Sequence, residues 1–102
     1  MDIHQSLAAL SNPVRRQILA WLKDRSNFPP PLKEHREVEG VCVGYIQEKT
    51  RLAQPTISNH MGKLKQAGLV RSKRHGQWTF YRRDEEAIRD FIDALAEELD
   101  TP

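Results

Sequence analysis

One short stretch of the chain carries groups that can read the edges of nucleic-acid bases. These groups are the amides and hydroxyls of four closely spaced residues, Gln54, Thr56, Ser58 and Asn59. Amide side chains can make paired hydrogen bonds to adenine, and hydroxyls can contact bases or phosphates. The four residues are therefore predicted to read bases in double-stranded DNA.

A run of basic residues surrounds this stretch. No acidic residue occurs from Arg51 to Arg83, whereas acidic residues dominate from Asp84 onward. A block of positive charge is a candidate for binding a polyanion, and the interleaved aromatic residues indicate folded material rather than a solvated tail. The residues predicted to contact the DNA backbone are His60, Lys63, Arg71, Lys73, Arg74 and Arg82.

Catalysis is not suggested by the same residues. Ser58 and His60 are two positions apart on one predicted helix, so their side chains point to different faces. No other grouping of serine, histidine and acid is evident in the sequence. We therefore expect no enzymatic activity and no cofactor.

The composition and length of the chain limit the class of protein to which it can belong. The chain has 102 residues, 38% hydrophobic and 29% charged, which is typical of one soluble globular domain covering residues 1–102. No stretch approaches the ~18 apolar residues of a membrane span, and the N-terminus lacks the pattern of a signal peptide. The single cysteine, Cys42, fits a reducing compartment. We expect a cytoplasmic protein with no membrane partner.

Helical periodicity places the base-reading residues on the second helix of a helix-turn-helix. Ile57, Met61 and Leu64 form an inward stripe on a helix over 54–67, which Gly68 ends. A helix over 43–52, with Ile46 and Tyr45 facing inward, precedes it. The motif is therefore predicted at about 43–67.

A β-hairpin follows directly. Two alternating segments, 70–74 and 77–82, flank His75-Gly76, and they predict a wing at about 70–83. Trp78 and Tyr81 are expected to pack this wing onto the domain.

The remaining segments frame the motif. A first helix at about 2–10 is followed by one over 13–23, whose Arg15 and Arg16 are expected at an exposed first turn. Three prolines predict a loop over 27–40, interpreted as a surface insertion whose role the sequence leaves open.

An apolar stripe on the last helix, at about 85–99, needs a partner surface. The predicted fold is mainly α with a β-hairpin, a winged helix-turn-helix in the order α-α-α-α-β-β-α. A chain this short gains stability by covering such a stripe with a second copy, so a dimer is expected.

Three motifs carry a resemblance to a known family. Residues 7–19 (LAALSNPVRRQIL), 54–61 (QPTISNHM) and 65–70 (KQAGLV) resemble the ArsR/SmtB family of bacterial repressors. The resemblance covers nearly the whole chain except the proline loop. It implies a homodimer whose first and last helices pack across the twofold axis, an inverted-repeat operator and repression released by an inducer, which the sequence does not identify. The dimer-interface residues predicted on this basis are Ile3, Leu7, Ile88, Phe91, Ile92, Leu95 and Leu99.

The sequence departs from the metal-sensing members of that family. Many of these carry a Cys-x-Cys pair entering the first motif helix; Cys42 matches the first position, but Gly44 occupies the second. Zinc-sensing relatives use histidine and carboxylate ligands on the last helix, which here has no histidine. A soft-metal site needs several thiolates or imidazoles, so we expect no metal site. Ala53 stands where relatives often carry a capping serine or threonine.

Two alternatives remain open at this point. The chain could be a thiol- or metal-responsive repressor that uses Cys42, or a winged helix that contacts only other proteins, because that fold does not fix function.

Overall fold

The computed structural model describes residues 3–100. Asp2, at the start of the predicted first helix, lies outside the described residues, as do Met1, Thr101 and Pro102. The helices are α1 (Ile3–Leu10), α2 (Pro13–Trp21), α3 (Val43–Thr50), α4 (Gln54–Gln66) and α5 (Glu85–Asp100), and the strands are β1 (Val41–Cys42), β2 (Val70–His75) and β3 (Trp78–Arg83). The predicted winged-helix order is confirmed, with β1 added before α3.

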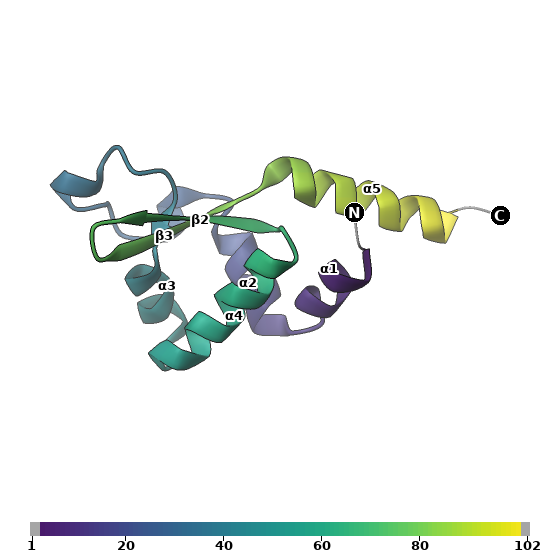
Figure 1. Ribbon diagram of the computed structural model, residues 1–102, viewed down its shortest axis with the longest axis horizontal. Coiled ribbons are helices and arrows are strands. Elements are labelled where there is room, and N and C mark those ends of the chain that lie inside the picture. The colour runs from purple at the N-terminus through teal and green to yellow at the C-terminus, as the bar shows by residue number, and fades with distance from the viewer. Residues whose placement is uncertain (1–2, 101–102) are drawn as a thin grey trace.

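The molecule has a body and an arm. In Figure 1 the sheet, α2, α3 and α4 form the body, while α5 extends away from it with α1 beneath. The shape is accordingly elongated, with extents of 52 × 27 × 21 Å. Over residues 3–100, none of the helices combines the length and the apolar character needed to cross a bilayer.

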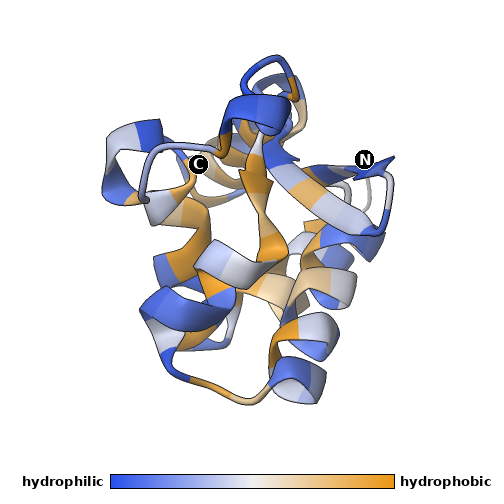
Figure 2. Cartoon of the chain, turned by 90° about the vertical axis from the view of Figure 1, so that its left-hand side faces the viewer, coloured by the Kyte–Doolittle hydropathy of each residue, from blue (hydrophilic) through white to orange (hydrophobic). Residues whose placement is uncertain are grey.

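The core forms where the apolar stripes of the helices meet the sheet. Ile18 of α2, Ile46 of α3 and the α4 stripe are fully buried, together with Leu69 and Val70 at the start of the hairpin. Figure 2 shows hydrophobic residues gathered toward the inside of the body and hydrophilic residues on its turns and outer faces. Because helical spacing fixes the buried positions of α2, α3 and α4, the sequence predicts those positions well.

Local capping determines where several helices begin and end. Asn12 Oδ1 accepts hydrogen bonds from the amides of Val14 and Arg15 at 2.8 and 3.2 Å, which begins α2. Asp84 Oδ1 accepts from the Ala87 amide at 3.0 Å and begins α5. Ala53, as expected, offers α4 no side-chain cap.

The turn of the helix-turn-helix is made by an unusual backbone conformation. Arg51 has a φ of 61°, in the left-handed region, and ends α3. A non-glycine residue rarely adopts this region. The tight reversal lets α4 begin at Gln54.

The sheet is antiparallel in the order β1-β3-β2. The hairpin turn falls at Gly76-Gln77, one residue later than predicted, because His75 belongs to β2 and pairs with Trp78. Cys42 in β1 lies opposite Phe80. The sequence did not predict β1, since a two-residue strand has no periodicity.

The segment 27–40 packs against the wing. It contains a short 3-10 turn at Lys33–His35, and His35 is buried with its ring edge-on to Phe80 at 5.1 Å and to Trp78 at 6.0 Å. Most of the segment is exposed, so it is a surface insertion as expected, and His35 anchors it to the wing. Trp78 lies edge-on to His35 of this segment, lines a pocket together with Tyr45 of α3, and remains 40% exposed. Tyr81 does pack against the core, as expected.

Candidate nucleic-acid interface

The exposed face of α4 carries the four predicted base readers. Gln54, Thr56, Ser58 and Asn59 are all exposed, while Ile57 on the opposite side is 1% exposed. Gln54 Nε2 donates a hydrogen bond to Ser58 Oγ at 3.0 Å. This bond spans one helical turn and holds the two side chains on the same outward face before any ligand arrives.

The predicted phosphate contacts divide into paired and unpaired cations. Arg71 Nε lies 2.8 Å from Asp84 Oδ2, and Arg82 Nε lies 3.2 Å from Glu39 Oε2. Lys63 and Lys73 are exposed and form no ion pair within the described part of the chain. The positive charge that is free to meet a polyanion therefore lies on α4 and along β2.

Arg74 lies near the tip of the wing. Its Nε donates to the Gly76 carbonyl at 3.2 Å, which leaves its two terminal amino groups unused by that bond, and no carboxylate pairs with it in residues 3–100. A planar guanidinium with free donors is suited to phosphate oxygens.

Asp84 joins the wing to α5. Its Oδ1 caps α5 through the Ala87 amide, while its Oδ2 pairs with Arg71. The capping bond and then the Arg71 bond hold the pKa of Asp84 below its usual value, and in turn Asp84 raises the pKa of Arg71. The pair stays charged at neutral pH, so Asp84 offsets the positive charge that a paired Arg71 brings to a phosphate.

His60 is tied to the interior on one side. Its Nδ1 lies 3.1 Å from Nη1 of Arg15. Because a guanidinium can only donate, Nδ1 accepts, and the proton of the neutral ring sits on Nε2. Desolvation, then the charges of Arg15 and Lys63, lower the pKa of His60. His60 is thus a neutral donor at pH 7.

Arg15 is a functional candidate that sequence reasoning missed. The expectation that it is exposed is wrong: it is 8% exposed, and its Nε donates to the Ala9 carbonyl at 2.6 Å. Arg15 thereby connects the C-terminal end of α1 to His60 of α4. The helical spacing of the sequence does not reveal that Arg15 is buried, because two adjacent arginines at the start of a helix are usually both exposed. Arg16 itself is exposed as expected.

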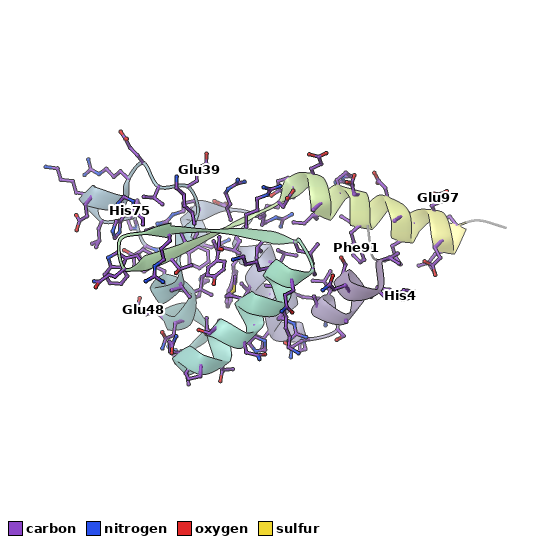
Figure 3. All side chains as sticks on the ribbon, viewed as in Figure 1. His4, Glu39, Glu48, His75, Phe91 and Glu97 are labelled. Atoms are coloured by element: carbon purple, nitrogen blue, oxygen red, sulfur yellow. The ribbon has the colours of Figure 1, made fainter. Side chains whose placement is uncertain are left out.

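The predicted dimer-interface residues occupy different environments within one chain. Ile88 and Phe91 are already buried at 8% and 6% exposure, whereas Leu7, Ile92 and Leu99 are exposed at 38%, 43% and 72%. Figure 3 shows Phe91 on the side of α5 that faces α1. Ile3 and Leu95 are partly buried. After one chain has folded, Leu7, Ile92 and Leu99 therefore remain available to contact a second copy, whereas Ile88 and Phe91 are already covered.

Cys42 is partly buried at the junction of β1 and α3. No group of three or more His, Cys, Asp or Glu side chains among residues 3–100 is arranged to hold a metal ion.

The comparisons with known proteins agree with this geometry. Residues 37–72 match the model of the family described as "Bacterial regulatory protein, arsR family". The uncharacterized HTH-type transcriptional regulator YbzH of Bacillus subtilis (strain 168) is 42% identical over 100 residues, covering 97% of this chain and all of that protein. The transcriptional repressor SdpR of the same organism is 31% identical, covering 82% of this chain and 78% of its own.

A solved structure supports the fold alone, because its sequence is only 20% identical. It is an ArsR family transcriptional regulator, RHA00566, with a TM-score of 0.72 over 95% of this chain and 86% of that one. Its similarity extends beyond the matched motif to the helices on either side. The family model and the two relatives show that this chain belongs to the arsR family of helix-turn-helix transcriptional regulators.

Proposed function

We propose that this chain, as a single domain over residues 1–102, is a homodimeric transcriptional repressor that binds an inverted-repeat operator in double-stranded DNA. One observation carries the proposal: the exposed face of α4 presents amides, hydroxyls and ammonium groups and no carboxylate. A helix of this kind fits the major groove.

The proposed contacts follow from the exposure and pairing of each side chain. Gln54, Thr56, Ser58 and Asn59 read base edges. Phosphates are held by Lys63, Lys73 and Arg74, with Arg71 and Arg82 joining only if they leave their carboxylate partners, and His60 donates through Nε2. The wing then follows the backbone beside the groove that α4 occupies.

Dimerisation is proposed through α1 and α5. The exposed side chains of Leu7, Ile92 and Leu99 offer apolar surface on these two helices, and a chain of this size gains stability by covering it. A twofold dimer would present two copies of α4 to the two halves of an inverted repeat.

A signal other than a metal is proposed to release the operator. Cys42 is the only thiol, and Gly44 stands where a second thiolate would be needed. Zinc, arsenite, peroxide and a chelator, added in turn to the complex, test this part. Release by zinc or arsenite would replace it with a metal-responsive mechanism, and release by peroxide with a thiol switch at Cys42.

A shift assay across a range of salt concentrations tests DNA binding, using DNA from upstream of the chain's own gene. The logarithm of affinity should fall with the logarithm of salt by ~0.9 per neutralised phosphate. Lys73→Ala should flatten this dependence, whereas Asn59→Ala should lower affinity by about 1–3 kcal/mol without changing the slope. The matched control is Arg89→Ala, an exposed cation in the acidic arm. Failure to bind at low salt would favour a module that contacts only proteins.

Light scattering at several protein concentrations tests the dimer. Ile92→Glu places a charge on the exposed apolar face of α5 and should give a monomer. Leu32→Glu is the control, because Leu32 is similarly exposed, at 50%, but lies in the loop far along the chain from α1 and α5. A dimer that survives Ile92→Glu, or one that Leu32→Glu disrupts equally, would place the interface elsewhere.

A further inference from the structure

A pocket of about 240 Å³ lies where the loop, α3 and the wing meet. Its apolar walls come from three separate parts of the chain: Pro31 and Leu32 of the loop, Tyr45 of α3, and Trp78 and Phe80 of β3. We call this space the loop–wing pocket. An apolar cavity of about 150 Å³ can hold benzene, so the loop–wing pocket has room for one aromatic ring and a small substituent.

The walls of the pocket are fixed in the free protein. Tyr45 donates its hydroxyl proton to the Pro30 carbonyl at 3.1 Å, which ties the loop to α3. His35 stands edge-on to Phe80 and Trp78, which ties the loop to the wing. A ligand would therefore bind without having to order the loop first.

Charge at the pocket favours an anion. Arg25 lines the pocket, with its guanidinium carbon 5.8 Å from the centre of the Tyr45 ring, and it forms no ion pair in residues 3–100. The imidazole of His35 is buried at the same site. One carboxylate opposes Arg25: Glu48, which also lines the pocket and is exposed. Figure 3 shows Glu48 on α3, below the wing that bears His75.

We propose that the loop–wing pocket binds a small single-ring aromatic carboxylate. The ring lies among Tyr45, Trp78 and Phe80, and the carboxylate meets Arg25. Several apolar walls with few polar groups at one end are typical of small-molecule sites, and a guanidinium pairs with a carboxylate through two parallel hydrogen bonds.

The same pocket gives the ligand a route to the wing, and this second part depends on the DNA-binding function proposed above. The loop holds the base of the wing through Glu39 and Arg82, and β3 contributes two walls of the pocket. An occupant that displaces β3 also displaces Lys73 and Arg74, which pair with Phe80 and Thr79 of that strand, from the positions they hold in the free protein. Binding should therefore lower the affinity for DNA.

Ligand binding can be measured without DNA. The chain has two tryptophans, Trp21 and Trp78, and only Trp78 lines the pocket, so Trp21→Phe leaves one reporter. Benzoate should change its fluorescence saturably, while benzylamine, which has the same ring and the opposite charge, should bind much more weakly. Arg25→Met should raise the Kd for benzoate roughly tenfold or more, and Glu48→Gln should lower it.

A second variant blocks the space itself. A Cβ added at Gly44, which lines the pocket, would meet only the Cys42 sulfur, at 3.9 Å, so the backbone there accepts a Cβ without a clash. Gly44→Leu should fill the pocket and abolish the benzoate response, whereas Gly44→Ala should weaken it less. A response that Arg25→Met and Gly44→Leu leave intact, stronger binding of benzylamine, or no saturable response to benzoate would overturn the site.

The regulatory part has its own readout. Benzoate should release DNA from the wild type but not from Arg25→Met, with each protein compared with itself in the absence of benzoate. DNA affinity that is unchanged at saturating benzoate would overturn regulation but leave the site standing. A protein that binds benzoate and no DNA would instead refute the proposed function.

Discussion

Replacing Arg15 with methionine removes a buried link between α1 and α4. The guanidinium donates to the Ala9 carbonyl at 2.6 Å and to His60 Nδ1 at 3.1 Å, and the side chain is 8% exposed. Methionine retains much of the side-chain volume and none of the donors. The variant therefore isolates the hydrogen bonds from the packing.

The expected cost follows mainly from these two bonds, because a third, from Arg15 Nη2 to the Ala8 carbonyl, is long at 3.4 Å. A hydrogen bond to a charged group contributes about 1.5–3 kcal/mol, and removing the donor leaves both acceptors short of a partner. Part of this loss of stability is offset in the methionine variant, because the folded protein no longer has to desolvate a charged guanidinium. We expect Arg15→Met to lower the free energy of unfolding by roughly 2–4 kcal/mol, and thus the Tm by more than about 8 °C at fixed protein concentration.

Urea and thermal unfolding followed by circular dichroism measure this loss. The matched control is Arg16→Met, the neighbouring residue on the exposed side of α2. Its guanidinium donates one solvent-exposed hydrogen bond, to the Leu10 carbonyl, so its replacement should cost less than about 1.5 kcal/mol. If the two variants unfold alike, or if Arg15→Met stays within about 0.5 kcal/mol of the wild type, the link contributes nothing and the reasoning is refuted.

Two further predictions concern backbone space and pH. Gly40 has a φ of +95°, and a Cβ there would lie 2.5 Å from the Tyr81 carbonyl oxygen. Gly40→Ala should therefore lower the free energy of unfolding by about 1–3 kcal/mol or more. Gly62→Ala, where a Cβ would meet open space, should instead raise the free energy of unfolding by about 0.5–1 kcal/mol. An equal effect of the two alanines would contradict the close approach. Because the folded protein holds the pKa of His60 below its usual 6.5, the unfolded chain binds more protons just below pH 6.5, so stability should fall as the pH drops through that value. Unfolding between pH 7.5 and 5.5 should show a smaller loss in His60→Gln; an identical loss would assign it to other groups.

Features that depend on local spacing were predictable from the sequence. The stripe of Ile57, Met61 and Leu64 fixes the inward side of α4, and therefore which polar residues face outward. Asn12 and Asp84 cap their helices through bonds within three residues. In each case the residues that interact are neighbours along the chain.

Features that depend on contacts between distant segments were not predictable. Arg15 is buried because His60, 45 positions away, faces it. Strand β1 forms because Val41 and Cys42 pair with Tyr81 and Phe80 of β3. His35 sits in a polar, proline-rich segment that reads as a loop, and only the aromatic faces of the wing give it a place to pack. The hydrophobic periodicity of the sequence carries no information about such contacts between distant segments.

The ion pairs at the base of the wing bear on how strongly salt should weaken DNA binding. If Arg71 and Arg82 keep Asp84 and Glu39 as partners, each protomer has Lys63, Lys73 and Arg74 left for phosphates. A dimer would then show a log–log slope of about −5, against about −9 if both arginines exchanged their carboxylates for phosphates. Exchange would leave two carboxylates beside the DNA, which is unfavourable, so the shallower slope is expected. Asp84→Asn and Glu39→Gln together should then steepen it, and a slope that these changes leave near −5 would mean that neither arginine reaches the backbone.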